Sequence, residues 1–183
     1  MSQSFISLNF LPKGKFRVDL VEGVTKTNFF SICYGALTTI GLLTFISYAT
    51  TYVLIENLSY QRNQIGTIVG DLQVVAEIAL LIIFLPVGLI ADKIGRRQVY
   101  SFGMFAMGLS YFLYPLATGI GELTLYRIIY AIGMGAATGM LGTVTADYPQ
   151  NRTRGKMIAV TGILNATGVI IVSLVFARLP ENF

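Results

Sequence analysis

Five long apolar stretches constrain the fold of this chain more than any other feature. They cover approximately residues 28–55, 64–91, 98–118, 122–145 and 156–178. Each stretch can cross the hydrocarbon core of a bilayer as a helix, which takes about 20 residues. Only 12% of the 183 residues are charged, about half the share found in soluble proteins. The sequence therefore predicts an all-α integral membrane protein with about five spans joined by short links.

The positions of Lys and Arg predict how these spans are oriented. Most of them precede the first stretch or follow the second and fourth stretches: Lys13, Lys15, Arg17, Lys26, Lys93, Arg96, Arg97, Arg152, Arg154 and Lys156. Arg62 and Arg178 fall on the opposite side, and Arg127 lies inside a stretch. Because cationic segments stay in the cytoplasm, we expect residues 1–27 to be cytoplasmic, residues 28–178 to span the membrane and residues 179–183 to lie outside. For residues 1–27, an amphipathic surface segment and a disordered tail both remain open.

The same positions bear on the partners and on the membrane. A net charge of +4 distributed in this way indicates contact with a lipid bilayer and no nucleic acid. The location expected is the cell membrane, which is the inner membrane if the source is bacterial. The chain has no His and a single Cys, Cys33, so it offers no metal-ligand set. With no nucleophile–base pair or phosphate-binding loop, we expect neither enzyme activity nor a cofactor.

The link after the second stretch, Gly-Leu-Ile-Ala-Asp-Lys-Ile-Gly-Arg-Arg-Gln-Val-Tyr at 88–100, concentrates charge and glycine. Asp92 falls at the C-terminal end of a helix, where the helix dipole disfavours an anion, so cations must offset its charge. The absence of a side chain at Gly88 permits close approach of another helix, and Gly95 permits a tight reversal. A generic cytoplasmic loop is the alternative interpretation.

This link resembles the signature G-x-L-A-D-R-x-G-R-K of the major facilitator superfamily, found between its second and third helices. The matching residues are Gly88, Asp92, Gly95, Arg96 and Arg97, and Lys93 replaces an arginine. Asp147, Arg154 and Gly155 are similar to the family's loop between helices four and five. The resemblance implies a charge network of Asp92, Arg96, Asp147 and Arg154, which would act as a gate that closes one access state.

Two carboxylates in the second stretch are candidates for coupling, because charges at membrane depth are costly and mark functional sites. Glu77 lies near the middle of the stretch and shares a helical face with Gln73. It could carry a proton, or it could be a neutral structural carboxyl. Asp71 lies nearer the outer end, where it could pair with Arg62 or Arg127 or remain a solvated helix end.

Arg127 is the third coupling candidate and also a candidate for substrate binding. Its run, Arg-Ile-Ile-Tyr-Ala-Ile-Gly-Met-Gly, is similar to the superfamily's fourth-helix pattern R-x-x-Q-G-x-G-A-A, with Tyr130 in place of the glutamine. The resemblance implies a role in proton translocation or in binding substrate charge, whereas snorkelling to the outer interface is the alternative. Thr44, Tyr48 and Asn165 complete the candidate substrate surface, although ordinary helix packing also explains them.

The resemblance covers roughly residues 29–178 and corresponds to the first five helices of a protein with two six-helix halves. We therefore expect an incomplete chain whose principal partner is a missing C-terminal half. The function implied is secondary active transport of a small-molecule substrate by alternating access, coupled to a proton gradient. A non-transporting membrane sensor or assembly factor is the alternative.

Overall fold

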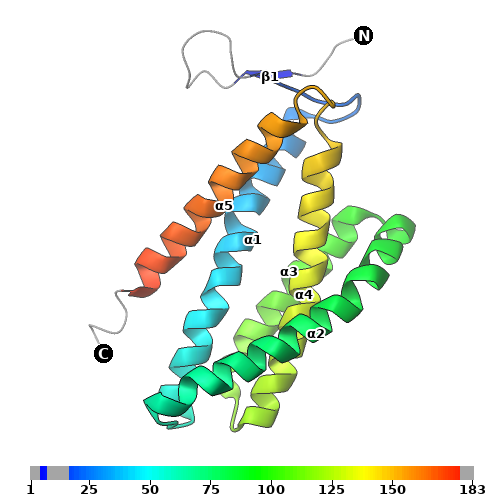
Figure 1. The fold of residues 1–183 in the computed structure, drawn as a ribbon. Coiled ribbons are helices and arrows are strands. Elements are labelled where there is room, and N and C mark those ends of the chain that lie inside the picture. Colours follow the sequence, from blue (N-terminus) through cyan, green and yellow to red (C-terminus); the bar gives the residue numbers. More distant parts are fainter. Residues whose placement is uncertain (1–4, 8–16, 178–183) are drawn as a thin grey trace. The chain divides into compact units, whose positions relative to one another are not determined.

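The computed structural model describes residues 5–7 and 17–177, which form five long helices and two short strands (Figure 1). The helices are α1 (Lys26–Tyr52), α2 (Arg62–Ile94), α3 (Arg96–Leu113), α4 (Ile120–Asp147) and α5 (Arg154–Ala177). A π-helical turn, Val53–Asn57, continues α1, and a 3-10 turn, Tyr114–Leu116, continues α3. Strands β1 (Phe5–Ser7) and β2 (Arg17–Asp19) pair in antiparallel fashion.

All five helices are long and apolar enough to cross a membrane, as the hydropathy pattern predicts. Each begins two residues before the apolar stretch predicted for it. Charged residues therefore begin α1, α2, α3 and α5, and charged residues also lie in the last turns of α2 and α4. The predictions for Lys13, Lys15, Arg178 and the tail at 179–183 lie outside the described residues.

The chain reverses at Gly95, the single residue between α2 and α3. Its φ angle is +98°, a conformation that side-chain-bearing residues rarely adopt. The Gly95 N–H still donates to the Ala91 carbonyl over 3.0 Å, so the hydrogen bonding of α2 continues to its last residue. The predicted reversal at this glycine is confirmed, and it is tighter than the six-residue link expected from the sequence.

The helices belong to two compact units, which divide α1, α4 and α5 between them. One unit, here called unit 1, comprises residues 1–42 and 141–174. In it, α1 and α5 approach so closely that a Cβ atom on Gly168 would collide with the carbonyl group of Leu37. A Cβ on Gly41 would lie 3.1 Å from the Gly168 carbonyl oxygen. Glycine on both helices therefore brings the two backbones into contact.

Unit 2 comprises residues 43–140 and 175–183. One apolar cluster in this unit is formed by buried side chains of α2, α3 and α4, namely Val87, Ala91, Val99, Ala136 and Met140. Helices α3 and α4 meet at Gly103 and Gly133. A Cβ on Gly103 would lie 2.6 Å from the Ala137 nitrogen, and one on Gly133 would lie 2.7 Å from the Gly103 oxygen. This contact fixes α4 against α3 and determines where the polar side chains of α4 lie.

Candidate functional site

Arg127 is buried in unit 2, with only 3% of its side chain exposed. One terminal nitrogen, Nη2, donates a hydrogen bond to the Gln73 side-chain oxygen on α2. The other, Nη1, lies 3.5 Å from the hydroxyl oxygen of Thr50 on α1. That hydroxyl donates to the Ile46 carbonyl over 2.7 Å, so its lone pairs are left to accept from the guanidinium. Arg127 therefore points into the protein, and the alternative that it snorkels to the outer interface is wrong.

Gln73 connects Arg127 to Glu77. The Gln73 side-chain nitrogen donates to a Glu77 carboxylate oxygen over 2.6 Å, while its oxygen accepts from Arg127. Gln73 and Glu77 are four residues apart and therefore lie on the same face of α2. The cation and the anion thus interact through one neutral amide instead of forming a direct ion pair.

Aromatic rings line the other side of the guanidinium. The Arg127 Cζ atom lies 5.3 Å from the centre of the Tyr130 ring, within the range of a cation–π interaction. Tyr130 in turn contacts Tyr111 of α3, with ring centres 5.9 Å apart, and its hydroxyl donates to the Leu43 carbonyl over 3.3 Å. The residue that replaces the family's glutamine is therefore part of the site. We call Thr50, Gln73, Glu77, Arg127 and Tyr130 the arginine cluster.

One nitrogen of Arg127 remains without a partner. Within the part of the chain that the structure describes, the buried Nε atom makes no hydrogen bond. Both side-chain groups that do contact the guanidinium nitrogens, the Thr50 hydroxyl and the Gln73 amide, are uncharged. An unpaired donor on a buried cation is costly. The cluster therefore retains capacity to bind an acceptor.

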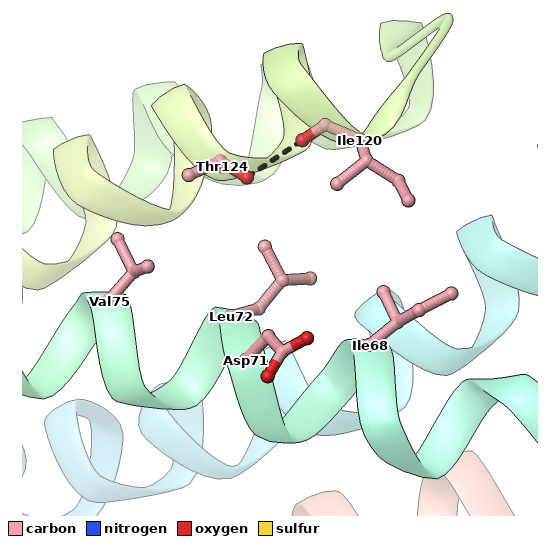
Figure 2. A pocket seen from close by; sticks show the side chains of 6 residues that line it. All are labelled: Ile68, Asp71, Leu72, Val75, Ile120 and Thr124. Atoms are coloured by element: carbon pink, nitrogen blue, oxygen red, sulfur yellow. Dashed lines mark hydrogen bonds between the residues drawn. The ribbon is translucent and has the colours of Figure 1, made fainter.

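Asp71 lies apart from this cluster. It lines a small cavity of about 100 Å³ between α2 and α4, together with Ile68, Leu72, Val75, Ile120 and Thr124 (Figure 2). The Thr124 hydroxyl there donates to the Ile120 carbonyl over 2.8 Å. Among the described side chains, no hydrogen bond or ion pair joins Asp71 to Arg62 or Arg127. Of the two alternatives for Asp71, the structure shows the exposed position and not the pairing. The guanidinium of Arg127 instead meets Gln73, two residues further along α2.

The other substrate candidates fall in both units. Thr44 and Tyr48 lie on the part of α1 that belongs to unit 2, the first half-buried and the second exposed. Asn165 lies on α5 in unit 1. Its side-chain oxygen is buried and has no hydrogen-bond partner among the described residues. That these three residues share a substrate surface stays a prediction.

The predicted gate residues also divide between the units. Asp92, in the last turn of α2, and Arg97, in the first turn of α3, are exposed, and Arg96 is half-buried. Asp147 ends α4 in unit 1, and Arg154 begins α5, where its Nη2 donates to the Asn151 side chain over 3.0 Å. A charge network that joins Asp92 and Arg96 to Asp147 and Arg154 stays a prediction.

Gly88 has open space around it: a Cβ atom there would meet no heavy atom within 4 Å. No helix of the described chain therefore approaches α2 closely at this residue. The close helix contact expected at Gly88 stays a prediction, and it would have to be made by a helix outside the described residues.

Sequence reasoning missed Gln73 and Thr50 as partners of Arg127. Gln73 was visible on the same face of α2 as Glu77, because the two residues are four positions apart. The sequence does not show which faces of α1 and α2 are turned toward α4, because that depends on packing contacts between the helices. For Thr50 no local signal was available, since a threonine in an apolar helix usually bonds only to its own backbone.

Five long apolar helices, with Arg127 buried among them, define a multi-pass membrane protein. The chain belongs to the Major Facilitator Superfamily, whose family model matches residues 33–182.

Individual relatives cover shorter regions. The chain is 29% identical over 134 residues to magnetosome protein MamH of Paramagnetospirillum magneticum, which covers 69% of this chain and 31% of the relative. It is 31% identical over 103 residues to low affinity inorganic phosphate transporter 5 of Petunia hybrida, covering 52% of this chain and 19% of the relative. It is also 31% identical over 98 residues to riboflavin transporter RibZ of Clostridioides difficile, covering 52% and 21%. The chain thus spans less than a third of the length of these relatives.

Proposed function

We propose that this chain forms the N-terminal part of a transporter that carries a small solute across a membrane by alternating access. Membership of the superfamily supports this proposal, and so do relatives that are named as transporters of phosphate and riboflavin. Transport requires no covalent chemistry on the solute, so we do not expect an enzyme or a resident cofactor. The remaining half of the binding site would come from a C-terminal half of the same transporter.

The observation that carries the proposal is the arginine cluster. A buried guanidinium whose side-chain hydrogen-bond partners are uncharged attracts anions strongly, since the low dielectric of the interior weakens screening. The unpartnered Nε atom of Arg127 adds a donor for an oxygen of the solute. We therefore propose a small oxyanion as the solute class, of which inorganic phosphate is the first to test.

Glu77 would couple this binding to protons. With Glu77 ionised, the arginine cluster contains one positive and one negative charge linked through Gln73. Protonation of Glu77 leaves the charge of Arg127 uncompensated, which favours entry of an anion. Deprotonation restores the internal compensation and favours release. Proton and anion would therefore move in the same direction.

Transport assays with the full-length protein test this proposal. Proteoliposomes would be loaded at alkaline pH, diluted into acidic medium with radiolabelled phosphate, and compared with vesicles without a pH gradient. We expect the gradient to stimulate uptake, Arg127→Met to abolish uptake, and Glu77→Gln to remove the effect of the gradient. Glu56→Gln is the matched control, because Glu56 is an exposed carboxylate in the turn that follows α1.

Each outcome has a defined meaning. Gradient-dependent uptake that persists in Glu77→Gln contradicts the coupling role. Normal uptake by Arg127→Met contradicts the anion site. If the wild-type protein carries none of a panel of phosphate, sulfate, carboxylates and riboflavin, the alternative of a sensor or assembly factor is favoured.

We propose that the N-terminus and the links after α2 and α4 face the cytoplasm, on the basis of their Lys and Arg content. In a bacterial source the location would be the inner membrane. Single-cysteine variants in a Cys33→Ala background test this orientation. In intact cells, a membrane-impermeant maleimide should label Asn63→Cys and leave Arg97→Cys unlabelled. Both residues are exposed, but Asn63 lies at the start of α2 and Arg97 at the start of α3, on opposite sides of the membrane in this orientation. The reverse pattern would overturn the assignment.

A further inference from the structure

Residues 18–21, here called the strap, pair with residues 148–153, here called the link, which joins α4 to α5. Both segments belong to unit 1, and Figure 1 shows the strands beside the turn between α4 and α5. The Val21 N–H donates to the Tyr148 carbonyl over 2.9 Å, and the Gln150 N–H donates to the Asp19 carbonyl over 2.8 Å. The strap and the link thus form a short antiparallel ladder between segments about 130 positions apart in the chain.

Side chains of the link strengthen this ladder. The Thr153 hydroxyl oxygen accepts from the Asp19 N–H over 3.1 Å and lies 3.0 Å from the Asp19 carbonyl oxygen, to which it can donate. The Gln150 side-chain nitrogen donates to the Leu20 carbonyl over 3.2 Å. The link therefore satisfies backbone groups of Asp19 and Leu20 that would otherwise be exposed to solvent.

The position of Pro149 explains why a proline is tolerated in this ladder. Leu20 and Pro149 face each other, and the two backbone hydrogen bonds are made by the residues on either side of them. In such a pair neither facing residue uses its own N–H. Pro149, which ends α4 by lacking this group, can therefore take part in the ladder without breaking it.

The strap and the link both contribute buried side chains to unit 1. Val18 is fully buried, and Leu20, Pro149 and Met157 of α5 are each at most 2% exposed. The strap is followed by a turn at Gly23, whose φ is +89°, and α1 begins at Lys26. Only a short turn separates the strap from α1, so the strap joins the start of α1 to the link.

We propose that the strap is a permanent tether that holds the link, and with it Asp147 and Arg154 at its two ends, fixed to the start of α1. The tether makes these three helix ends move as one body. What the tether implies for transport rests on the proposed function. If the chain gates by alternating access, the link and the start of α1 keep the same positions relative to each other during that motion. The tether itself does not depend on that function.

Cysteine accessibility tests the tether without a transport assay. In a Cys33→Ala background, Leu20→Cys and Glu22→Cys would be labelled with a soluble maleimide in membranes opened on both sides. The first position is buried and the second exposed. We expect Cys at 20 to react at least tenfold more slowly than Cys at 22. Equal rates at the two positions would overturn the proposal.

Thr153→Val supplies the matched perturbation. Valine keeps the shape of threonine but removes the hydroxyl that bonds to Asp19. The control is Thr161→Val, because the equally buried Thr161 bonds only to carbonyls of its own helix, at Met157 and Ile158. We expect Thr153→Val to accelerate labelling at position 20 at least threefold, and Thr161→Val to leave it unchanged. The same acceleration in both variants would show that the hydroxyl of Thr153 is not what holds the strap.

A disulfide distinguishes a permanent tether from a contact that opens during transport. Facing residues without mutual hydrogen bonds have Cα atoms about 4.5 Å apart, within the range that a disulfide spans. Leu20→Cys with Pro149→Cys should cross-link on mild oxidation, detected by loss of maleimide-polyethylene glycol mass shifts. Glu22→Cys with Asn151→Cys, which antiparallel pairing displaces in opposite directions, should not.

Uptake by the cross-linked full-length protein gives the final outcome. A permanent tether predicts that oxidation changes the uptake rate less than twofold, and a large, reductant-reversible loss of uptake would overturn it in favour of an opening latch. If the reduced protein also shows no uptake, the proposed function fails. The labelling rates at position 20 still decide the tether in that case.

Discussion

Arg127 and Glu77 interact through a single side chain, because the Gln73 amide accepts a hydrogen bond from the first and donates one to the second. A direct ion pair would compensate both charges at once and would hold them in one arrangement. The intervening amide instead separates the two charges, while a hydrogen bond joins it to each of them. Gln73 is therefore the residue on which the integrity of the arginine cluster depends most.

Replacing Gln73 by leucine should destabilise the protein. The substitution keeps the size of the side chain and removes the acceptor for Arg127 and the donor for Glu77. Hydrogen bonds between membrane helices contribute on the order of 1–2 kcal/mol, so we expect a clear fall in the melting temperature of the detergent-purified protein. Gln64→Leu, at an exposed position near the start of the same helix, is the control. Equal melting temperatures for the two variants would show that the amide bridge carries no stability.

Gly168→Ala should disrupt unit 1. The new Cβ atom would collide with the Leu37 carbonyl group, and backbone atoms cannot move aside without shifting α1 or α5. Gly162, six residues earlier on α5, has no atom within 4 Å of an added Cβ. Gly162→Ala should therefore be neutral or stabilising by up to about 1 kcal/mol, because alanine favours a helix more than glycine does. Monodispersity in size-exclusion chromatography and melting temperature check both variants, and similar behaviour of the two would contradict the packing.

Gly103→Ala provides the equivalent test for unit 2. The added Cβ atom would lie 2.6 Å from the Ala137 nitrogen and 2.8 Å from the Gly133 oxygen, so α3 and α4 must separate. Overpacking of this kind costs about 1–3 kcal/mol, and the displacement of α4 should also disturb Arg127. Gly108→Ala, on the same helix with open space around it, should be tolerated. The measurement is again thermal unfolding, and a stable Gly103→Ala variant would rule out the close contact.

Ser59→Gly should stabilise the protein, in contrast to most substitutions. Ser59 has a φ of +52°, a conformation that costs residues with a side chain roughly 1 kcal/mol. Glycine removes that strain. The same change at Ser101, an exposed position inside α3, should instead destabilise by roughly 0.3–0.5 kcal/mol, because glycine is a poorer helix former than serine. Opposite shifts in melting temperature are the expected result, and shifts of the same sign would contradict the strain at Ser59.

The sequence predicts the helices well because each must carry its own apolar length. It also predicts the reversal at Gly95, since only glycine accepts the backbone angle found there. It also makes Arg127 a candidate functional residue, because a charge is costly inside a membrane, and that role stays a prediction. These are local properties, and each depends on the residues of one segment.

The partners of Arg127 and the strap depend on contacts between distant segments. Periodicity places Gln73 and Glu77 on one face of α2 but does not tell which helix that face meets. The segment that leads into the strap has a weak signal of its own, because Arg17, Val18, Asp19 and Leu20 alternate between charged and apolar, as strands do. Four residues are too few to separate that pattern from chance in a chain dominated by helices.

The burial of Arg127 also constrains how the protein is made. An arginine in an isolated helix opposes membrane insertion, by up to about 2.5–3.5 kcal/mol at the helix centre. The acceptors of Arg127, Thr50 and Gln73, lie on α1 and α2. Both helices precede α4 in the chain and leave the ribosome first. During synthesis they can receive the guanidinium as α4 enters the bilayer. The order of the helices in the chain therefore places Thr50 and Gln73 in the membrane before Arg127 enters it.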